Sequence, residues 1–147
     1  MDPGLKIRPS EQSDYSFLIA AWLNNYRRES YFAARITDKV FFHHHHDIVE
    51  RLLARSRVLV ACVPDDPNEI IGYIVWEPGI LHWTYVKKAF RKLGVGAALL
   101  KATDLPDDLA GVSITHPTKL WFTTKQNGNG LEAKFPAAIH NPYLGAI

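Results

Sequence analysis

The sequence predicts a single domain over residues 1–147 of mixed α/β (α+β) class, with a mostly antiparallel central sheet flanked by helices. Three apolar segments separated by turn residues indicate consecutive strands at 58–63, 70–76 and 80–86. Two segments in which apolar residues recur at helical spacing precede these strands. A helical segment headed by glycines follows them.

A short strand and two amphipathic helices come first. Residues 5–8 form the expected strand, which Pro9 closes. In the first helix the apolar side chains fall on or near one face: Phe17, Leu18, Ala21, Trp22 and Tyr26. A second helix is expected from Thr37 or Asp38 to about Arg55, with apolar residues at helical spacing: Phe41, Ile48, Val49, Leu52 and Leu53.

The strands after these helices are separated by strong turn signals. Residues 64–68 (Pro-Asp-Asp-Pro-Asn) join the first two strands into a hairpin, and Pro78-Gly79 turns the chain into the third. A helix is expected from about Gly94 to Thr103. Further strands are expected at 112–115 and 120–124, with a loop at 126–130.

Composition is that of a small globular protein. The chain has 147 residues, of which 47% are hydrophobic and 22% charged, so disorder is not expected. A single cysteine, Cys62, excludes an internal disulfide framework. No apolar run approaches the length of a membrane span, and the N-terminus has no signal-peptide character. A cytoplasmic protein is therefore expected. The net charge of +2 does not indicate nucleic acid binding.

The most informative segment leads from the third strand into the glycine-headed helix. The first N–H groups of a helix are unpaired, and the helix dipole attracts anions there. Gly94 and Gly96 remove Cβ atoms that would keep a phosphate away. Basic residues surround the turn: Lys87, Lys88, Arg91 and Lys92. The segment therefore predicts a site for a pyrophosphate. The alternative is that Gly94 is only a turn glycine and Gly96 only allows close packing of helix on strand.

Two related glycine motifs do not fit. A Walker A loop needs Lys-Ser/Thr after its last glycine, and a Rossmann fingerprint needs a third glycine where Leu99 stands. The remaining pattern, Arg91-x-x-Gly94-x-Gly96 after a strand ending in Val86, resembles the acyl-CoA loop of the GNAT superfamily of N-acyltransferases. The order of elements over about residues 5–104 resembles the GNAT fold too. The resemblance implies acetyl-CoA as co-substrate, held by these residues: Tyr85, Val86, Arg91, Lys92, Leu93, Gly94, Val95, Gly96 and Ala97.

The chemistry that this resemblance implies is direct transfer of an acetyl group from acetyl-CoA to a primary amine. A backbone N–H on the strand that ends at Tyr85-Val86 would polarise the thioester carbonyl. The alternative is a binding module without turnover that holds coenzyme A or another phosphate-bearing partner. The sequence does not identify the acceptor. It leaves the oligomeric state open, with a homodimer as one option.

Two side chains are candidates for the base. Alternation along the strand places His82, Thr84 and Val86 on one face, opposite Leu81, Trp83 and Tyr85. Imidazole takes up a proton near neutral pH; the alternative is that His82 is a half-buried histidine bonded to a backbone carbonyl. Glu77 could hold a relay water or be a solvated turn carboxylate.

Two further features concern the acid and a metal. The tail tyrosine that GNAT members use as general acid has no clear counterpart, and Tyr143 is the candidate by default. The run His43-His44-His45-His46 invites a metal, but consecutive histidines on a helix point in different directions. We therefore expect a polar helix surface and no metal. The GNAT resemblance implies that this aromatic region, with Tyr31, Phe32, Phe41 and Phe42, borders the acceptor site and helps to select the acceptor.

Overall fold

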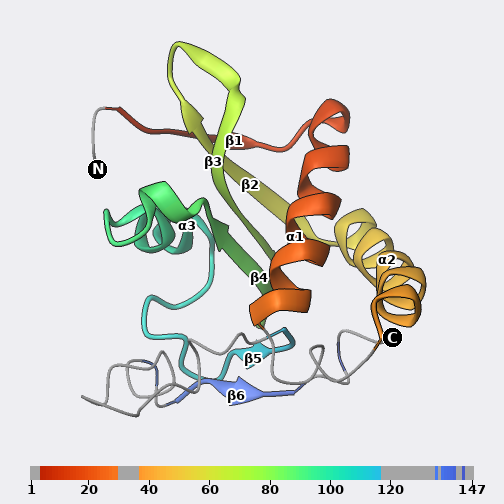
Figure 1. Ribbon diagram of the computed structural model, residues 1–147. Helices are drawn as coiled ribbons and strands as arrows, with labels where there is room; N and C mark the ends of the chain where they lie inside the picture. The colour runs from red at the N-terminus through yellow and green to blue at the C-terminus, as the bar shows by residue number, and fades with distance from the viewer. Residues whose placement is uncertain (1–3, 30–36, 117–134, 136, 142–143, 145–147) are drawn as a thin grey trace.

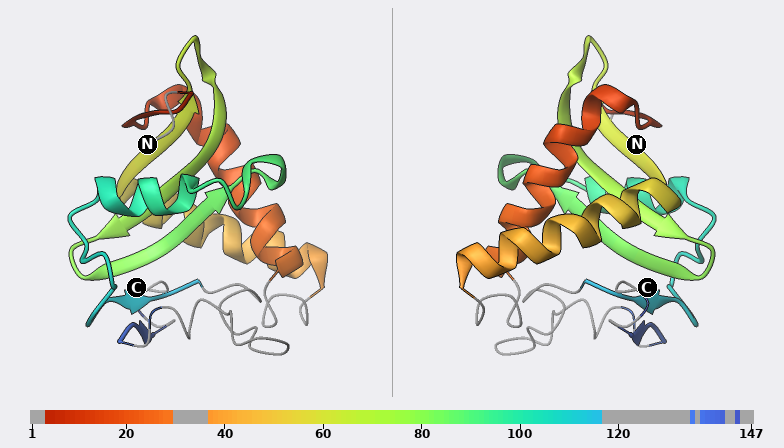
Figure 2. Two further views of the ribbon diagram at one scale, coloured as in Figure 1. Left: turned by 90° about the vertical axis from the view of Figure 1, so that its left-hand side faces the viewer. Right: turned by 90° about the vertical axis from the view of Figure 1, so that its right-hand side faces the viewer.

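A computed structural model describes residues 4–29, 37–116, 135, 137–141 and 144. Its elements follow the chain in the order β1 (Lys6–Pro9), η1 (Gln12–Asp14), α1 (Tyr15–Glu29), α2 (Asp38–Arg55), β2 (Arg57–Val63), β3 (Asp66–Glu77), β4 (Ile80–Val86), η3 (Lys88–Phe90), α3 (Val95–Ala102), β5 (Ser113–Ile114) and β6 (Ile139–His140). Helices α1 and α2 cover one face of the sheet and α3 covers the other (Figures 1 and 2). The predicted fold class is confirmed.

The sheet has six strands in the order β1-β2-β3-β4-β5-β6. The first four are antiparallel, whereas β5 runs parallel to β4 and pairs with it at Ile80 and Leu81. The last hydrogen bond between them runs from the Thr115 N–H to the Leu81 carbonyl, at 3.2 Å. Beyond it, no strand of the described part of the chain lies beside β4 on this side. Residues 83–86 of β4 are therefore paired only with β3.

Apolar side chains pack on both faces of the sheet. On one face Leu18, Trp22 and Tyr26 of α1, spaced four residues apart, are buried against the sheet. The hydroxyl of Tyr73 on β3 donates to the Leu18 carbonyl at 2.7 Å and ties this helix to the sheet. On the other face α3 buries Val95 and Leu99. Each fully buried side chain of this size contributes about 1.5–3 kcal/mol, so packing fixes both layers.

Three details differ from the sequence-based expectations. Strand β3 begins at Asp66, because only Pro64 and Asp65 are needed for the turn. Strand β5 is shorter than expected, and β6 was not predicted. The strand expected at 120–124 and the loop at 126–130 lie outside the described residues. None of the helices that the structure describes is both long and apolar enough to cross a lipid bilayer.

Candidate functional site

The loop that joins β4 to α3 is held by hydrogen bonds within itself. After Val86 the chain makes the single turn η3 and reaches Gly94, which caps α3 in the left-handed region with a φ of 85°. The Arg91 Nε donates to the Val86 carbonyl at 2.8 Å and closes the loop on the end of the strand. Lys92 also has a positive φ, of 67°. The loop is therefore a defined turn at the head of a helix.

The first N–H groups of α3 point out of this turn. The first helical hydrogen bond runs from the Ala98 N–H to the Gly94 carbonyl, so the N–H groups of residues 95–97 precede every intrahelical acceptor. They lie at the positive end of the helix dipole. This geometry suits an anionic group such as a pyrophosphate.

The two glycines of the loop have different reasons to be glycine. At Gly94 the positive φ is sufficient, because L side chains rarely adopt it. At Gly96 a Cβ would meet only the Val86 Cγ2, at 3.9 Å, which is an ordinary contact. The protein's own packing therefore does not require glycine at position 96. A small residue at this position leaves room for a bound group beside the first turn of α3.

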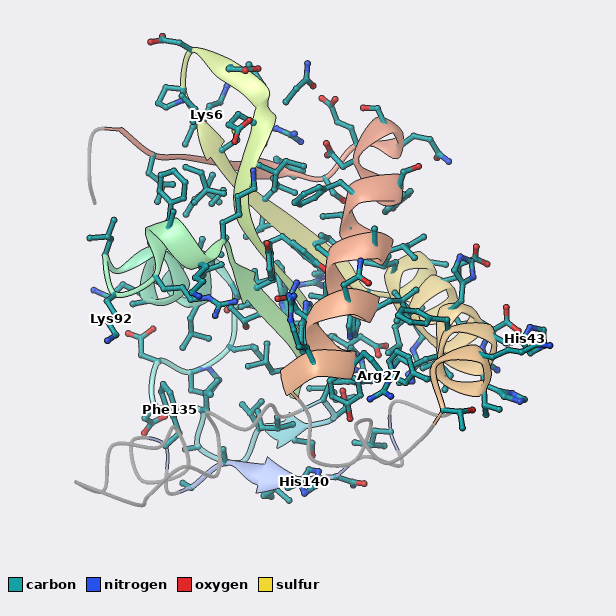
Figure 3. The ribbon with its side chains drawn as sticks, in the orientation of Figure 1. Lys6, Arg27, His43, Lys92, Phe135 and His140 are labelled. Atoms are coloured by element: carbon teal, nitrogen blue, oxygen red, sulfur yellow. The ribbon has the colours of Figure 1, made fainter. Side chains whose placement is uncertain are left out.

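The basic residues around the loop are not equivalent. The Lys87 Nζ lies 2.9 Å from Glu69 and 5.7 Å from the centre of the Phe17 ring, so its charge is partly neutralised within the protein. Lys88, Arg91 and Lys92 are exposed. Figure 3 shows Lys92 on the outer side of the loop. The cationic surface is therefore formed mainly by the last three residues.

A β-bulge lies at His82 in the middle of β4. Val75 of β3 is opposite Trp83, whereas the next residue, Trp76, is opposite Leu81, so His82 is the extra residue. A bulge disrupts the alternation of side chains. Trp83 packs among the residues of α1 and α2. His82 lies on the same side, because its hydrogen bonds lead through Thr115 and His116 to α2. The expected face alternation is therefore wrong at this position.

Glu77 and His82, predicted as separate candidates, are directly bonded. The His82 Nε2 lies 2.6 Å from the Glu77 Oε2, which also accepts from the Arg55 Nε at 3.0 Å. Partial burial opposes ionisation of Glu77, but the hydrogen bonds from His82 and Arg55 prevail and lower its pKa. Burial lowers the pKa of His82, although Glu77 opposes this shift. At neutral pH the pair is therefore a carboxylate and a neutral imidazole.

The second ring nitrogen of His82 continues into a buried chain. Its Nδ1 lies 2.8 Å from the Thr115 Oγ1, which lies 2.9 Å from the His116 Nδ1. The His116 Nε2 then lies 3.0 Å from the Nε2 of His45 on α2. Both ring nitrogens of His82 are thus occupied, so its ring has no nitrogen left to face a substrate directly.

Aromatic rings enclose the middle of this chain. The His116 ring centre lies 5.2 Å from that of Trp22 and 4.9 Å from that of Tyr26. Burial holds the pKa of His116 well below its usual value, with His45 and His82 contributing. Burial also lowers the pKa of His45 to about 4. We infer that all three histidines are neutral at pH 7.

The sequence analysis missed Thr115, His116 and the inward position of His45. One signal was present, because His45 stands four residues from both Phe41 and Val49 on the buried stripe of α2. The expected polar surface holds for His43, which is exposed and points away from α1 (Figure 3). It is wrong for His45, which stacks on Tyr26 at 5.1 Å.

A groove of about 680 Å³ runs along α1 and reaches β4. It is lined by Phe17, Ala20, Ala21, Asn24, Asn25, Arg27, Arg28, Phe42 and Tyr85. Tyr85 belongs to the half of β4 that lacks a described neighbour on one side. Phe42 brings the predicted aromatic region of α2 into the lining. The groove therefore connects the open part of β4 with α1 and α2.

Two other candidate features, a tyrosine and a group of metal-ligand type, add nothing to this site. Tyr143, the candidate acid, lies outside the described residues. In the described part of the chain, one group of metal-ligand type has its atoms within 4.8 Å of one another: His46, Asp47 and Glu50. Both carboxylates are exposed on one turn of α2. Such spacing is common on helix surfaces, so we assign no metal to it.

Comparison with solved structures gives the fold. A histone acetyltransferase HPA2 and related acetyltransferase from Corynebacterium glutamicum matches with a TM-score of 0.52 and 17% identity, over 67% of this chain and 68% of that one. The apo form of YjaB from Escherichia coli matches with a TM-score of 0.51 and 18% identity, over 66% of this chain and 62% of that one. Comparisons with protein-family models and with curated proteins give no match.

These likenesses define the class of fold. The chain has a GNAT-like fold over about two thirds of its length. At such low identities the likeness concerns the fold and leaves activity to be argued from the site.

Proposed function

We propose that this protein is an N-acyltransferase of a single domain that moves an acetyl group from acetyl-CoA directly to a primary amine. The observation that carries the proposal is the β4–α3 loop. It combines an open helix N-terminus, three exposed cations and a glycine at position 96 that packing does not require. The GNAT-like fold supports the same assignment, because in that fold the loop after the fourth strand binds acyl-CoA.

The half of β4 that follows its described pairing with β5 supports a place for the thioester. In the antiparallel pair, the Lys87 N–H bonds to the Ile71 carbonyl, so the polar groups of alternate residues point away from β3. Thr84 and Val86 belong to this second set. Their backbone N–H groups are candidates for polarising the thioester carbonyl. We place the acceptor amine in the groove beside α1, which Tyr85 joins to this half of β4.

A binding module without turnover is the second candidate. One observation favours it, because His82 uses both ring nitrogens within the protein and cannot serve as a direct base. Such a module would bind acetyl-CoA through the same loop and release it unchanged. Turnover and binding must therefore be measured separately.

Thermal shift with acetyl-CoA tests the binding site. A ligand at 100 times its dissociation constant stabilises the folded state by about 2.7 kcal/mol, and free acetate or GTP should give no comparable shift. The variant Gly96→Asp should lose the shift, because its carboxylate repels the pyrophosphate. The matched control Gly96→Ala should keep it, because GNAT loops accept alanine there and the added Cβ has room. No shift with the native protein would reject both the enzyme and a module that binds coenzyme A.

A screen of acyl transfer onto a library of amines, read by mass spectrometry, separates the two candidates. Acetylated products formed only in the presence of protein and acetyl-CoA would support the enzyme. A protein that binds acetyl-CoA but acetylates no amine would instead support the binding module.

A further inference from the structure

Five side chains from four parts of the chain form one continuous line of hydrogen bonds. They are Glu77, His82, Thr115, His116 and His45, joined over distances of 2.6–3.0 Å. The three inner members are only 1%, 2% and 7% exposed. The two ends are more accessible: the Glu77 side chain is 22% exposed, and His45 is partly buried. The line therefore crosses the interior between two ends near solvent.

The direction of each hydrogen bond follows from the carboxylate. An ionised Glu77 only accepts, so the His82 Nε2 must carry the proton. The neutral His82 then accepts at Nδ1, and the Thr115 hydroxyl donates to it. Thr115 accepts from the His116 Nδ1–H in turn.

The same argument fixes the last ring. Since the proton of neutral His116 is on Nδ1, its Nε2 accepts and the His45 Nε2 donates. The tautomers thus alternate along the line as Nε2–H, Nδ1–H and Nε2–H. The Nδ1 of His45 is left with a lone pair. Every donor points toward Glu77.

We propose that these side chains form a proton shuttle, in which His45 is the catalytic base and acid and the other four are positioning residues. This inference rests on the proposed function. The line passes the last described hydrogen bond between β4 and β5, which joins Leu81 and Thr115, next to His82 and His116. The proposed thioester site lies further along the same strand, at Thr84 and Val86. Phe42, three residues before His45 on α2, lines the groove in which we place the amine.

The steps balance without an external reagent. As the amine nitrogen forms its bond to the thioester carbon, the His45 Nδ1 takes one N–H proton and passes its Nε2 proton to His116. His116 passes its Nδ1 proton to Thr115, Thr115 passes its hydroxyl proton to His82, and the His82 Nε2 proton moves to the Glu77 carboxylate. When the carbon–sulfur bond breaks, each transfer reverses. His45 then protonates the thiolate, and the line returns to its first state without any ring flip.

Histidine NMR tests the arrangement itself. Long-range ¹H–¹⁵N correlation of histidine-labelled protein at pH 7.5 should show His82 and His45 as Nε2–H tautomers and His116 as Nδ1–H. Thr115→Val removes the hydroxyl at nearly constant volume, so His116 and His82 should lose their fixed tautomers. The matched control Thr115→Ser keeps the hydroxyl and should keep the native pattern. A native His116 found as Nε2–H, or as a mixture of tautomers, would overturn the proposal.

Kinetics test the transfer. Loss of general acid–base catalysis typically lowers the rate by roughly 10²–10⁴-fold, and we expect Thr115→Val to lower kcat at least about tenfold with KM for acetyl-CoA unchanged. Thr115→Ser should restore kcat. If Thr115→Val does not fold, His45→Phe replaces it, because a phenyl ring keeps the stacking on Tyr26 and Phe41. Native kcat in the variant used would reject the shuttle.

The two kinds of failure are distinguishable. Absence of acetyl-CoA binding or of acyl transfer by the native protein rejects the proposed function, and with it the shuttle as a catalytic device. The tautomer pattern is measured without acetyl-CoA, so it still decides whether the oriented line exists. Acyl transfer with a disordered tautomer pattern rejects the shuttle alone.

Discussion

The loop after β4 and the bulge within β4 differ in exposure and in the parts of the chain that form them. At its C-terminal end an exposed loop of consecutive residues leads into α3, and its features are backbone N–H groups and solvated cations. At its bulge, His82 is buried in a line of side chains drawn from α2, β3, β4 and the end of β5. Local geometry makes the first region, and tertiary packing makes the second.

This difference predicts how the two regions respond to change. Exposed loop residues contribute little to folding, so substitutions there should alter ligand binding more than stability. Removing the hydrogen-bond partner of a buried polar group costs more stability, because no water replaces that partner. The four predictions below are ordered by their expected effect on the free energy of unfolding.

The largest effect is expected for Trp22→Ala, behind the buried line. Trp22 is fully buried, stacks on Trp83 with centres 5.6 Å apart and contacts the His116 ring. Removing the indole leaves a cavity, and such truncations cost about 3–5 kcal/mol. Urea unfolding measures this loss. As a control, Val40→Ala on the exposed side of α2 should change stability by less than about 0.5 kcal/mol. Similar losses in both variants would contradict the assigned packing.

Acidification is expected to weaken the fold through the same region. The pKa of His45 is about 4 in the folded protein, compared with 6.5 for an ordinary histidine, because burial disfavours its charged form. The unfolded chain therefore binds protons first as the pH falls, and stability is lost between about pH 6.5 and pH 4. His82 and His116 shift in the same direction.

Other charges near the line act at lower pH. The pKa of Glu77 is lowered, so its contribution is present above the ordinary carboxyl range and is lost only as the pH falls below it. Melting temperatures at pH 7.5 and pH 5 measure the effect. His45→Phe should reduce the loss, whereas His43→Ala, on the exposed side of the helix, should leave it unchanged. A melting temperature independent of pH over this range would refute the neutral state of the histidines.

A smaller effect is expected for Gly94→Ala. The φ of 85° strains any residue with a Cβ, at a cost of about 1–2 kcal/mol. The strained loop should also bind acetyl-CoA less tightly, as calorimetry would show. Gly94→Asn is the matched control, because asparagine tolerates the left-handed region better and should recover part of both losses. If Gly94→Ala is as stable as the native protein, the turn does not require this φ.

The smallest effect on stability is expected for Lys92→Glu. Its side chain is exposed, so the free energy of unfolding should change by less than about 0.5 kcal/mol. The affinity for acetyl-CoA should fall several-fold at low salt, and the difference from the native protein should shrink as salt is added. Lys6→Glu, on β1 away from the loop in Figure 3, makes the same charge change as a control. Equal loss of affinity in both variants would indicate only a general effect of net charge.

Much of the fold was readable from the sequence. Apolar periodicity placed α1, α2 and β4 within a few residues, because each buries a repeating face against one partner layer. The turn at the head of α3 could also be predicted, because a helix N-terminus and its glycines are contiguous in the chain. The C-terminal part was less readable: the short β5 and β6 pair with distant strands and have little pattern of their own.

The sequence by itself determined the layered α/β architecture and the turn at Gly94, because short-range spacing and backbone sterics specify them. Only the tertiary structure decided that Glu77 and His82 are partners and that the bulge turns His82 toward the helices. It also decided that His45, within the run of four histidines, bonds to His116. These relations join residues up to 71 positions apart. They exist because folding removes water from polar groups that must then bond to one another.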